Sequence, residues 1–259
     1  NNIQQHVINN SYCKDNNYID FKDHYLNNDT PLFNPNYIRY YRQFTHIRYM
    51  NLQQTSPSVN TCYREGNFNQ TCLNKKISNS QFPKLTDITW GGTHKTNRLD
   101  RIGQGLPLEV LVNLINALDI HPWMVIPHNA DDDYIIALAR ALDRISPHLT
   151  TYVEYSNETW NGTYLAHHYL KLKTDNSDKY GLAKAYVIET TRVHNLWRKT
   201  ANKPFKRVIS GYQGDPSLSK VLLENGVSDV LAIGGYYYGC FKVNILCKEQ
   251  DLLTNETTV

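Results

Sequence analysis

Helices and short apolar strands alternate strictly from residue 106 onward, and this alternation constrains the fold more than any other feature of the sequence. Apolar residues recur at three- and four-residue spacing from Leu108 to Leu118, which predicts an amphipathic helix. The apolar run at 122–127 lies between two prolines and is typical of a buried parallel strand. Such alternation predicts right-handed crossovers onto a parallel sheet.

The same patterns predict the remaining elements. We expect helices at 36–44, 134–145, 165–172, 181–200 and 216–224, and strands at 46–50, 151–155, 207–211 and 229–233. Polar clusters follow several of these strands, as is the rule at the carboxyl ends of strands in a (β/α)8 barrel. A doubly wound open sheet is the alternative, although no glycine-rich phosphate loop supports it. The predicted fold class is therefore α/β, a (β/α)8 TIM barrel whose closing strands are not recognisable in this chain.

The length of 259 residues suits one large domain better than two. Residues 1–35 are polar and rich in asparagine, so we expect an irregular N-terminal segment. Residues 36–240 form the partial barrel domain, and 241–259 a tail or linker. Within the domain, 51–85 is a long polar loop, and loops of that length are usually functional or need a covalent staple.

The charge and hydropathy patterns exclude several classes of partner. The net charge is +3 with 20% charged residues, too mild to indicate nucleic acid or an anionic membrane surface. No apolar run approaches the roughly 18 residues of a membrane span. The sequence starts without methionine or a signal-like apolar stretch, so we expect a mature or excised piece of a longer protein.

The five cysteines lack the spacing of a metal site, and we predict neither a metal nor a cofactor. Cys62 and Cys72 bracket one short polar loop, and Cys240 and Cys247 bracket another, which predicts two local disulfides. Cys13 is left over and would pair with a part of the protein outside this sequence. The alternative is that all five are free thiols.

Asn-x-Ser/Thr triplets occur six times and, with the cysteines, indicate a secreted or extracellular glycoprotein. The acceptors that we predict are Asn9, Asn28, Asn69, Asn161 and Asn255. The sixth triplet, at Asn157, lies on the end of a predicted strand.

Residues 152–161 read Tyr-Val-Glu-Tyr-Ser-Asn-Glu-Thr-Trp-Asn, a strand that runs into a polar tip. The tip presents a carboxylate beside a carboxamide and an indole. An acid transfers protons, an amide binds a hydroxyl group, and an aromatic ring stacks on the apolar face of a sugar. This combination indicates sugar chemistry.

A longer pattern resembles secreted, cellulase-like proteins of the clan A glycoside hydrolases. The likeness spans about residues 30–240, is strongest at 105–162, and is carried by Pro107–Leu111, Pro122-Trp123, Pro127–Tyr134 and Tyr152–Asn161. The resemblance implies a (β/α)8 barrel and a retaining mechanism. It assigns Glu158, at the end of the fourth strand, as the general acid/base.

The same resemblance implies three further roles. Asn157 would bind the substrate, Arg48 would help to hold the nucleophile from the end of strand two, and Tyr237 would face the same carboxylate after strand six. The chain departs from the family because no seventh strand ending in a glutamate is recognisable, and retaining hydrolysis needs a second carboxylate. Either a missing segment or another chain completes the barrel, or the nucleophile has been lost.

Other candidates carry a functional and a structural interpretation. Trp90 and Trp160 could form a sugar platform or belong to the core, and His128 could bind a sugar hydroxyl or cap its loop. Glu154 alternates with outward residues, so it could point inward and form a buried pair with Arg48, and we favour this structural role over a catalytic one.

Asn157 presents a conflict, because Thr159 makes it a possible glycan acceptor. A glycan at that place would block the cleft. The sequence therefore predicts a retaining hydrolase of a β-linked polysaccharide. The alternative is a non-catalytic, hydrolase-derived structural or glycan-binding module of an extracellular assembly.

Overall fold

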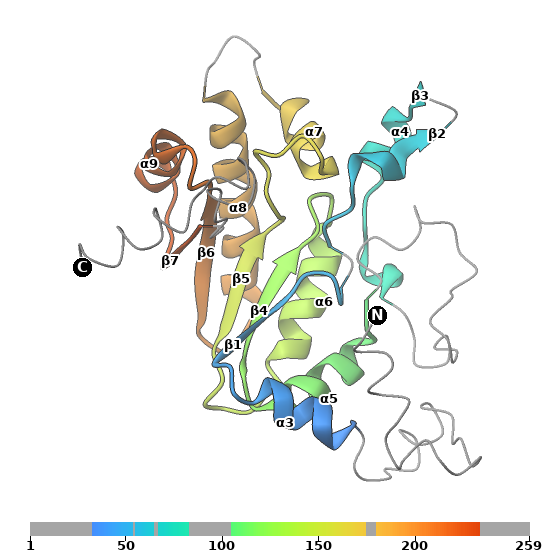
Figure 1. Ribbon diagram of the computed structural model, residues 1–259, viewed down its shortest axis with the longest axis vertical. Helices are drawn as coiled ribbons and strands as arrows, with labels where there is room; N and C mark the ends of the chain where they lie inside the picture. The colour runs from blue at the N-terminus through green and yellow to red at the C-terminus, as the bar shows by residue number, and fades with distance from the viewer. Residues whose placement is uncertain (1–32, 54, 65–66, 83–104, 175–179, 234–259) are drawn as a thin grey trace, which may run out of the picture.

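The computed structural model describes residues 33–53, 55–64, 67–82, 105–174 and 180–233, and they form an α/β fold around a parallel sheet (Figure 1). The sheet has five strands in the order β1-β4-β5-β6-β7, all parallel. The strands are β1 (His46–Tyr49), β4 (His121–Ile126), β5 (Thr151–Tyr155), β6 (Phe205–Gly211) and β7 (Val230–Ile233). The predicted strands are therefore confirmed to within two residues at either end.

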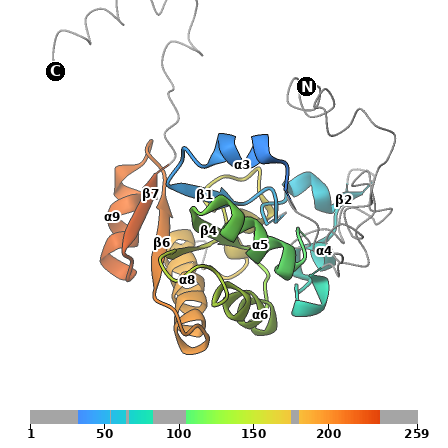
Figure 2. The same cartoon turned by 90° about the horizontal axis from the view of Figure 1, so that it is seen from below.

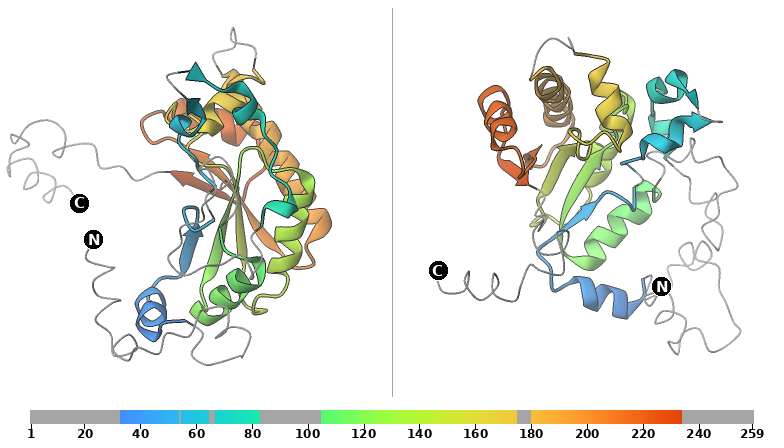
Figure 3. Two further views of the ribbon diagram at one scale, coloured as in Figure 1. Left: turned by 90° about the vertical axis from the view of Figure 1, so that its right-hand side faces the viewer. Right: turned by 45° about the horizontal axis from the view of Figure 1, so that its top comes forward.

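Six of the described helices precede or follow these strands. They are α3 (Pro35–Tyr41), α5 (Leu108–Leu118), α6 (Asp132–Leu142), α7 (Leu165–Lys171), α8 (Gly181–Thr200) and α9 (Pro216–Asn225). Figures 2 and 3 show a curved sheet with α5, α6, α8 and α9 along its outer side, while α3 lies beside α5 below the strands. None of α5, α6, α8 and α9 lies on the opposite side of the sheet.

The predicted closed eight-stranded barrel is wrong. The described residues form an open sheet of five strands, with β1 and β7 at its two edges, in the shape of half a barrel. The local patterns predict each parallel crossover correctly, but alternation of helix and strand does not determine how many strands a sheet contains. The α/β class itself is confirmed.

Side-chain caps fix where two of the crossover helices begin. Asp131 accepts a hydrogen bond from the backbone N–H of Tyr134 at 2.9 Å at the start of α6. Asp215 accepts one from Leu218 at 3.1 Å at the start of α9, where Pro216 occupies the first turn. Both caps satisfy backbone donors that have no partner within the helix.

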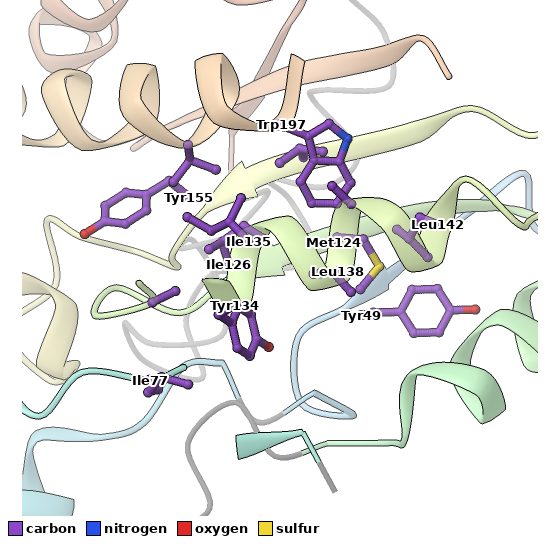
Figure 4. Packing of buried hydrophobic residues seen from close by; sticks show 14 of the residues in the cluster. Tyr49, Ile77, Met124, Ile126, Tyr134, Ile135, Leu138, Leu142, Tyr155 and Trp197 are labelled. Carbon is purple, nitrogen blue, oxygen red and sulfur yellow. The ribbon is translucent and has the colours of Figure 1, made fainter. Parts of the chain in front are cut away.

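The main core lies between the sheet and its helices (Figure 4). Met124 and Ile126 of β4 and Tyr155 of β5 are fully buried, as are Leu138 of α6 and Trp197 of α8. Alternate strand residues point to the opposite side, since successive side chains leave a strand in opposite directions. That opposite side carries the polar and aromatic residues of the candidate site.

The predicted polar loop at 51–85 is partly structured. It contains the 3-10 helices η2 (Val59–Cys62) and η3 (Asn79–Gln81), the hairpin strands β2 (Tyr63–Arg64) and β3 (Asn67–Phe68), and α4 (Gln70–Asn74). The predicted disulfide between Cys62 and Cys72 is present, with their Cα atoms 5.6 Å apart. Among the described helices, none has the length and apolar character needed to cross a membrane.

Candidate functional site

A small pocket of about 210 Å3 lies where the strands end at their carboxyl side. Residues of all five strands and of the loop after β5 line it: Arg48, Trp123, Glu154, Asn157, Glu158, Trp160, Ser210, Ala232 and Ile233. Four of these, Arg48, Asn157, Glu158 and Trp160, are among the predicted site residues. The carboxyl ends of parallel strands meet at one edge of the sheet, and this brings the four side chains together.

Arg48 and Glu154 form a two-point ion pair beneath the pocket. Nε of Arg48 donates to Oε2 of Glu154 at 2.9 Å, and Nη2 donates to Oε1 at 2.8 Å. The side chain of Glu154 is 1% exposed, whereas that of Arg48 is 31% exposed. The predicted pairing of Glu154 with Arg48 is therefore confirmed, with the carboxylate buried and the guanidinium partly exposed.

Two neighbouring strands supply further donors to the same carboxylate. Trp123 Nε1 donates to Oε2 of Glu154 at 2.8 Å, and the hydroxyl of Ser210 donates to Oε1. Burial raises the pKa of Glu154, while Arg48 and the hydrogen bonds act in the opposite direction without cancelling it. The guanidinium of Arg48 also lies 5.4 Å from the centre of the Trp123 ring. The result is a fixed polar floor for the pocket.

Asn157 connects this floor to the ligand-facing part of the pocket. Its Oδ1 accepts a hydrogen bond from Nη2 of Arg48 at 2.9 Å, and its Nδ2 donates to the hydroxyl of Ser56 at 3.0 Å. The residue is 3% exposed. A glycan on Asn157 would have to be attached to an Nδ2 that is buried and bonded to Ser56, so the geometry opposes the blocked-site hypothesis.

Glu158 stands on a strained turn just beyond β5. Ser156 and Glu158 adopt left-handed backbone conformations, with φ of 59° and 42°. Non-glycine residues rarely occupy this region, and such strain often marks functional sites. The amide of Asn161 donates to Oε2 of Glu158 at 2.9 Å. Glu158 is partly exposed, so its carboxylate is accessible from the pocket.

Trp160 forms one wall of the pocket. Its ring stacks on that of Tyr212, with centroids 5.8 Å apart and an angle of 21° between the planes. Tyr212 follows β6, so the stacked pair links the ends of two adjacent strands. Trp160 therefore lines the candidate pocket and is not part of the main core.

The remaining predicted site residues lie elsewhere. His128 does not line the pocket; it is 1% exposed and its ring lies edge-on against Tyr169, with centroids 5.2 Å apart. Trp90 and Tyr237 lie outside the described residues. Burial lowers the pKa of His128 to about 3, assisted by the charges of Lys76 and Lys173.

Sequence reasoning missed four contributors to the site: Ser56, Trp123, Ser210 and Tyr212. Trp123 pairs with Arg48 in the strand register, and this pairing places both side chains on the same face. A register argument could have found Trp123. Ser210 lies before the polar cluster Gln213-Gly214-Asp215 that follows β6. Asp215 of that cluster is the N-cap of α9.

Two of the predicted glycan acceptors, Asn69 and Asn161, lie among the described residues. Asn69 is exposed and caps α4, with its side chain accepting from the backbone N–H of Cys72 at 3.0 Å. Asn161 is partly exposed beside the pocket. The predicted acceptors and disulfide outside the described residues are Asn9, Asn28, Asn255 and the pair Cys240–Cys247, and Cys13 lies there as well.

No group of three or more histidine, cysteine or acidic side chains that could hold a metal ion occurs in the described part of the chain. The pocket instead offers carboxylate, amide, guanidinium and indole groups to a ligand. Comparison with protein-family models, with curated proteins and with solved structures found no match to this chain.

Proposed function

We propose that this chain binds a β-linked polysaccharide in the pocket at the strand ends, and that Glu158 is the proton-transferring group of a retaining hydrolase. One observation carries the proposal: an accessible carboxylate, a buried carboxamide and two indoles share one small pocket. Indole faces pack against the apolar faces of sugars, and polar groups between them fix the orientation of the hydroxyls.

Neighbouring residues hold the side chain of Asn157: its Nδ2 donates to Ser56, and the carboxamide also bonds the phenol of Tyr164. The partly exposed carboxylate of Glu158 is the group that can reach a ligand. Glu158 would protonate the leaving oxygen of the glycosidic bond and then take a proton from the attacking water.

The second carboxylate of a retaining enzyme must lie about 5–5.5 Å from the first and must be free to attack the sugar. Among the described residues that line the pocket, Glu154 is the only other carboxylate. Four donor groups saturate its oxygens, namely two from Arg48, one from Trp123 and one from Ser210. We therefore assign Glu154 to the support of the site and not to nucleophilic attack.

The saturation of Glu154 favours a second candidate function. If no other carboxylate enters the pocket, the site binds a glycan without cleaving it. The chain would then be a glycan-binding module derived from a hydrolase. Sequons and the Cys62–Cys72 disulfide suit either function in an oxidising, secretory environment.

Variants of Glu158 separate these functions. The full chain with Thr163→Ala, which removes the predicted glycan acceptor site at Asn161, would be secreted from eukaryotic cells and tested for binding of β-linked oligosaccharides by calorimetry and for release of reducing ends. We expect binding and release by this protein, and binding without release when it also carries Glu158→Gln. Glu224→Gln is the matched control, because Glu224 is an exposed carboxylate on α9.

Each other outcome has a defined meaning. Binding without release by the Thr163→Ala protein would identify a glycan-binding module. Unchanged release by Glu158→Gln would refute the proton-transfer role, and absence of binding to any oligosaccharide would refute both functions.

A further inference from the structure

Asn161 lies directly against the carboxylate of Glu158. Its Nδ2 donates to Oε2 of Glu158 at 2.9 Å, and its backbone N–H donates to the carbonyl oxygen of Glu158 at 2.8 Å. Asn161 therefore closes the turn that carries Glu158 and also contacts the carboxylate itself.

Asn161 is also the first residue of the triplet Asn161-Gly162-Thr163. Gly162 and Thr163 are exposed, and the backbone N–H of Thr163 donates to Oδ1 of Asn161 at 3.0 Å. This contact turns Oδ1 toward the following residues and leaves Nδ2 on the side of Glu158. The acceptor atom of the triplet is thus the atom that bonds the carboxylate.

We propose that N-glycosylation of Asn161 closes the Glu158 pocket, an inference that rests on the proposed function. The amide nitrogen would displace the phosphate of a phosphate-activated sugar donor. A bond forms between Nδ2 and the anomeric carbon, the phosphate leaves with its electron pair, and Nδ2 loses one proton. Asn161 is then the attachment point of an N-linked glycan in contact with Glu158, which lines the pocket.

The distance between the two side chains sets where such a glycan begins. A C–N single bond is roughly 1.45 Å long, so the first sugar carbon would lie within about 4.4 Å of Oε2 of Glu158. The attached sugar would therefore occupy the side of the carboxylate that faces Asn161. Rotation of the Asn161 side chain would relieve the crowding but would remove its hydrogen bond to Glu158.

Asn69 provides an internal comparison. Its triplet, Asn69-Gln70-Thr71, is exposed at the start of α4, and the Asn69 side chain bonds the backbone of Cys72 and not Glu158. A glycan on Asn69 would therefore leave Glu158 accessible. The two triplets differ because only Asn161 bonds the Glu158 carboxylate.

The test uses the full chain secreted from eukaryotic cells, in the parent form and as Thr163→Ala, Thr163→Ser and Thr71→Ala. Glycopeptide mass spectrometry would measure the occupancy of Asn161. Carbodiimide coupling of an amine to Glu158, measured on its peptide, would report access to the carboxylate without any substrate. We expect slow coupling in the parent, in Thr163→Ser and in Thr71→Ala, and several-fold faster coupling in Thr163→Ala.

An unmodified Asn161 in the secreted parent, or equal coupling rates in the parent and Thr163→Ala, would overturn the inference. Oligosaccharide binding by Thr163→Ala tests the proposed function separately. Faster coupling without oligosaccharide binding by that variant would support closure by the glycan and contradict the proposed function.

Discussion

Arg48 and Glu154 are bonded at two points, yet the two side chains differ in burial. Glu154 is almost completely buried, whereas about a third of the Arg48 side chain reaches solvent. A buried charge that loses its partner has no water to replace it, while a charge near the surface does. The two halves of the pair should therefore respond differently to substitution.

We predict that Arg48→Met lowers the free energy of unfolding by about 3–5 kcal/mol, because it leaves the Glu154 carboxylate buried without its cation. Glu154→Gln should cost less, about 1–3 kcal/mol, since the amide keeps part of the hydrogen bonding. Urea unfolding would measure both changes.

The exposed pair Lys220–Glu224 on α9 is the control for this comparison, and Lys220→Met should change the unfolding free energy by less than about 0.5 kcal/mol. Equal losses for Arg48→Met and Glu154→Gln would contradict the argument from burial.

Acid should destabilise the protein through two buried histidines. Burial lowers the pKa of His128 to about 3 and that of His194 to about 4, below the value of about 6.5 in the unfolded chain. Their contribution is present above pH 6.5 and is lost as the pH falls, because the unfolded chain then binds protons that the folded protein does not. Between pH 7 and 5, each histidine should remove up to about 2 kcal/mol.

His128→Phe isolates one of these contributions. Neither ring nitrogen of His128 has a hydrogen-bond partner among the described residues, so phenylalanine keeps the packing against Tyr169 without losing a bond. We expect this variant to lose about 2 kcal/mol less than the parent between pH 7 and 5 in urea unfolding. Identical pH dependence in the two proteins would count against His128 as a source of acid sensitivity.

The sequence predicts the elements of this fold well and its extent poorly. Apolar spacing located α5, α6 and α8, and the proline-bounded run located β4, because burial acts on each segment independently. The number of strands depends on which segments pair at the sheet edges, and no local pattern records that. This is why a closed barrel was predicted where the described residues form an open sheet.

In the candidate site as well, local patterns predict individual residues but not the contacts between strands. Alternation along β5 was enough to direct Glu154 inward and pair it with Arg48. Trp123 and Ser210 reach the same carboxylate from neighbouring strands, and their contribution depends on the register between strands. Register between strands arises from the packing of the whole sheet, so the local sequence pattern of one strand does not reveal it.

The wall of the pocket should matter for ligand affinity. Trp160→Ala removes the indole and its stacking with Tyr212, and we predict a loss of oligosaccharide affinity of about 1 kcal/mol or more. Tyr212→Leu should have a smaller effect, because Tyr212 acts by supporting Trp160. Calorimetric titration of both variants in the Thr163→Ala background would measure these changes.

Tyr40→Leu is the control for the aromatic wall. Tyr40 is 59% exposed on α3 and does not line the pocket, so its loss should leave the affinity unchanged. A loss of affinity for Tyr40→Leu equal to that for Trp160→Ala would indicate a general effect of exposed aromatic residues.

The Cys62–Cys72 disulfide should stabilise the segment that runs from β1 to α4 and contacts the loop after β5. It joins residues ten apart in sequence, and a loop of that length predicts about 2–3 kcal/mol from restriction of the unfolded chain. The same segment carries Ser56, which accepts the hydrogen bond from Asn157, and Pro57, whose carbonyl oxygen accepts from Leu165 at 3.0 Å. A double substitution of Cys62 and Cys72 by serine should therefore lower the unfolding free energy by that amount and weaken oligosaccharide binding in the same preparation.

Reductant should reproduce the lower stability in the parent and add nothing in the double variant if this bridge is responsible. A further loss in the double variant would assign the effect of reductant to other cysteines.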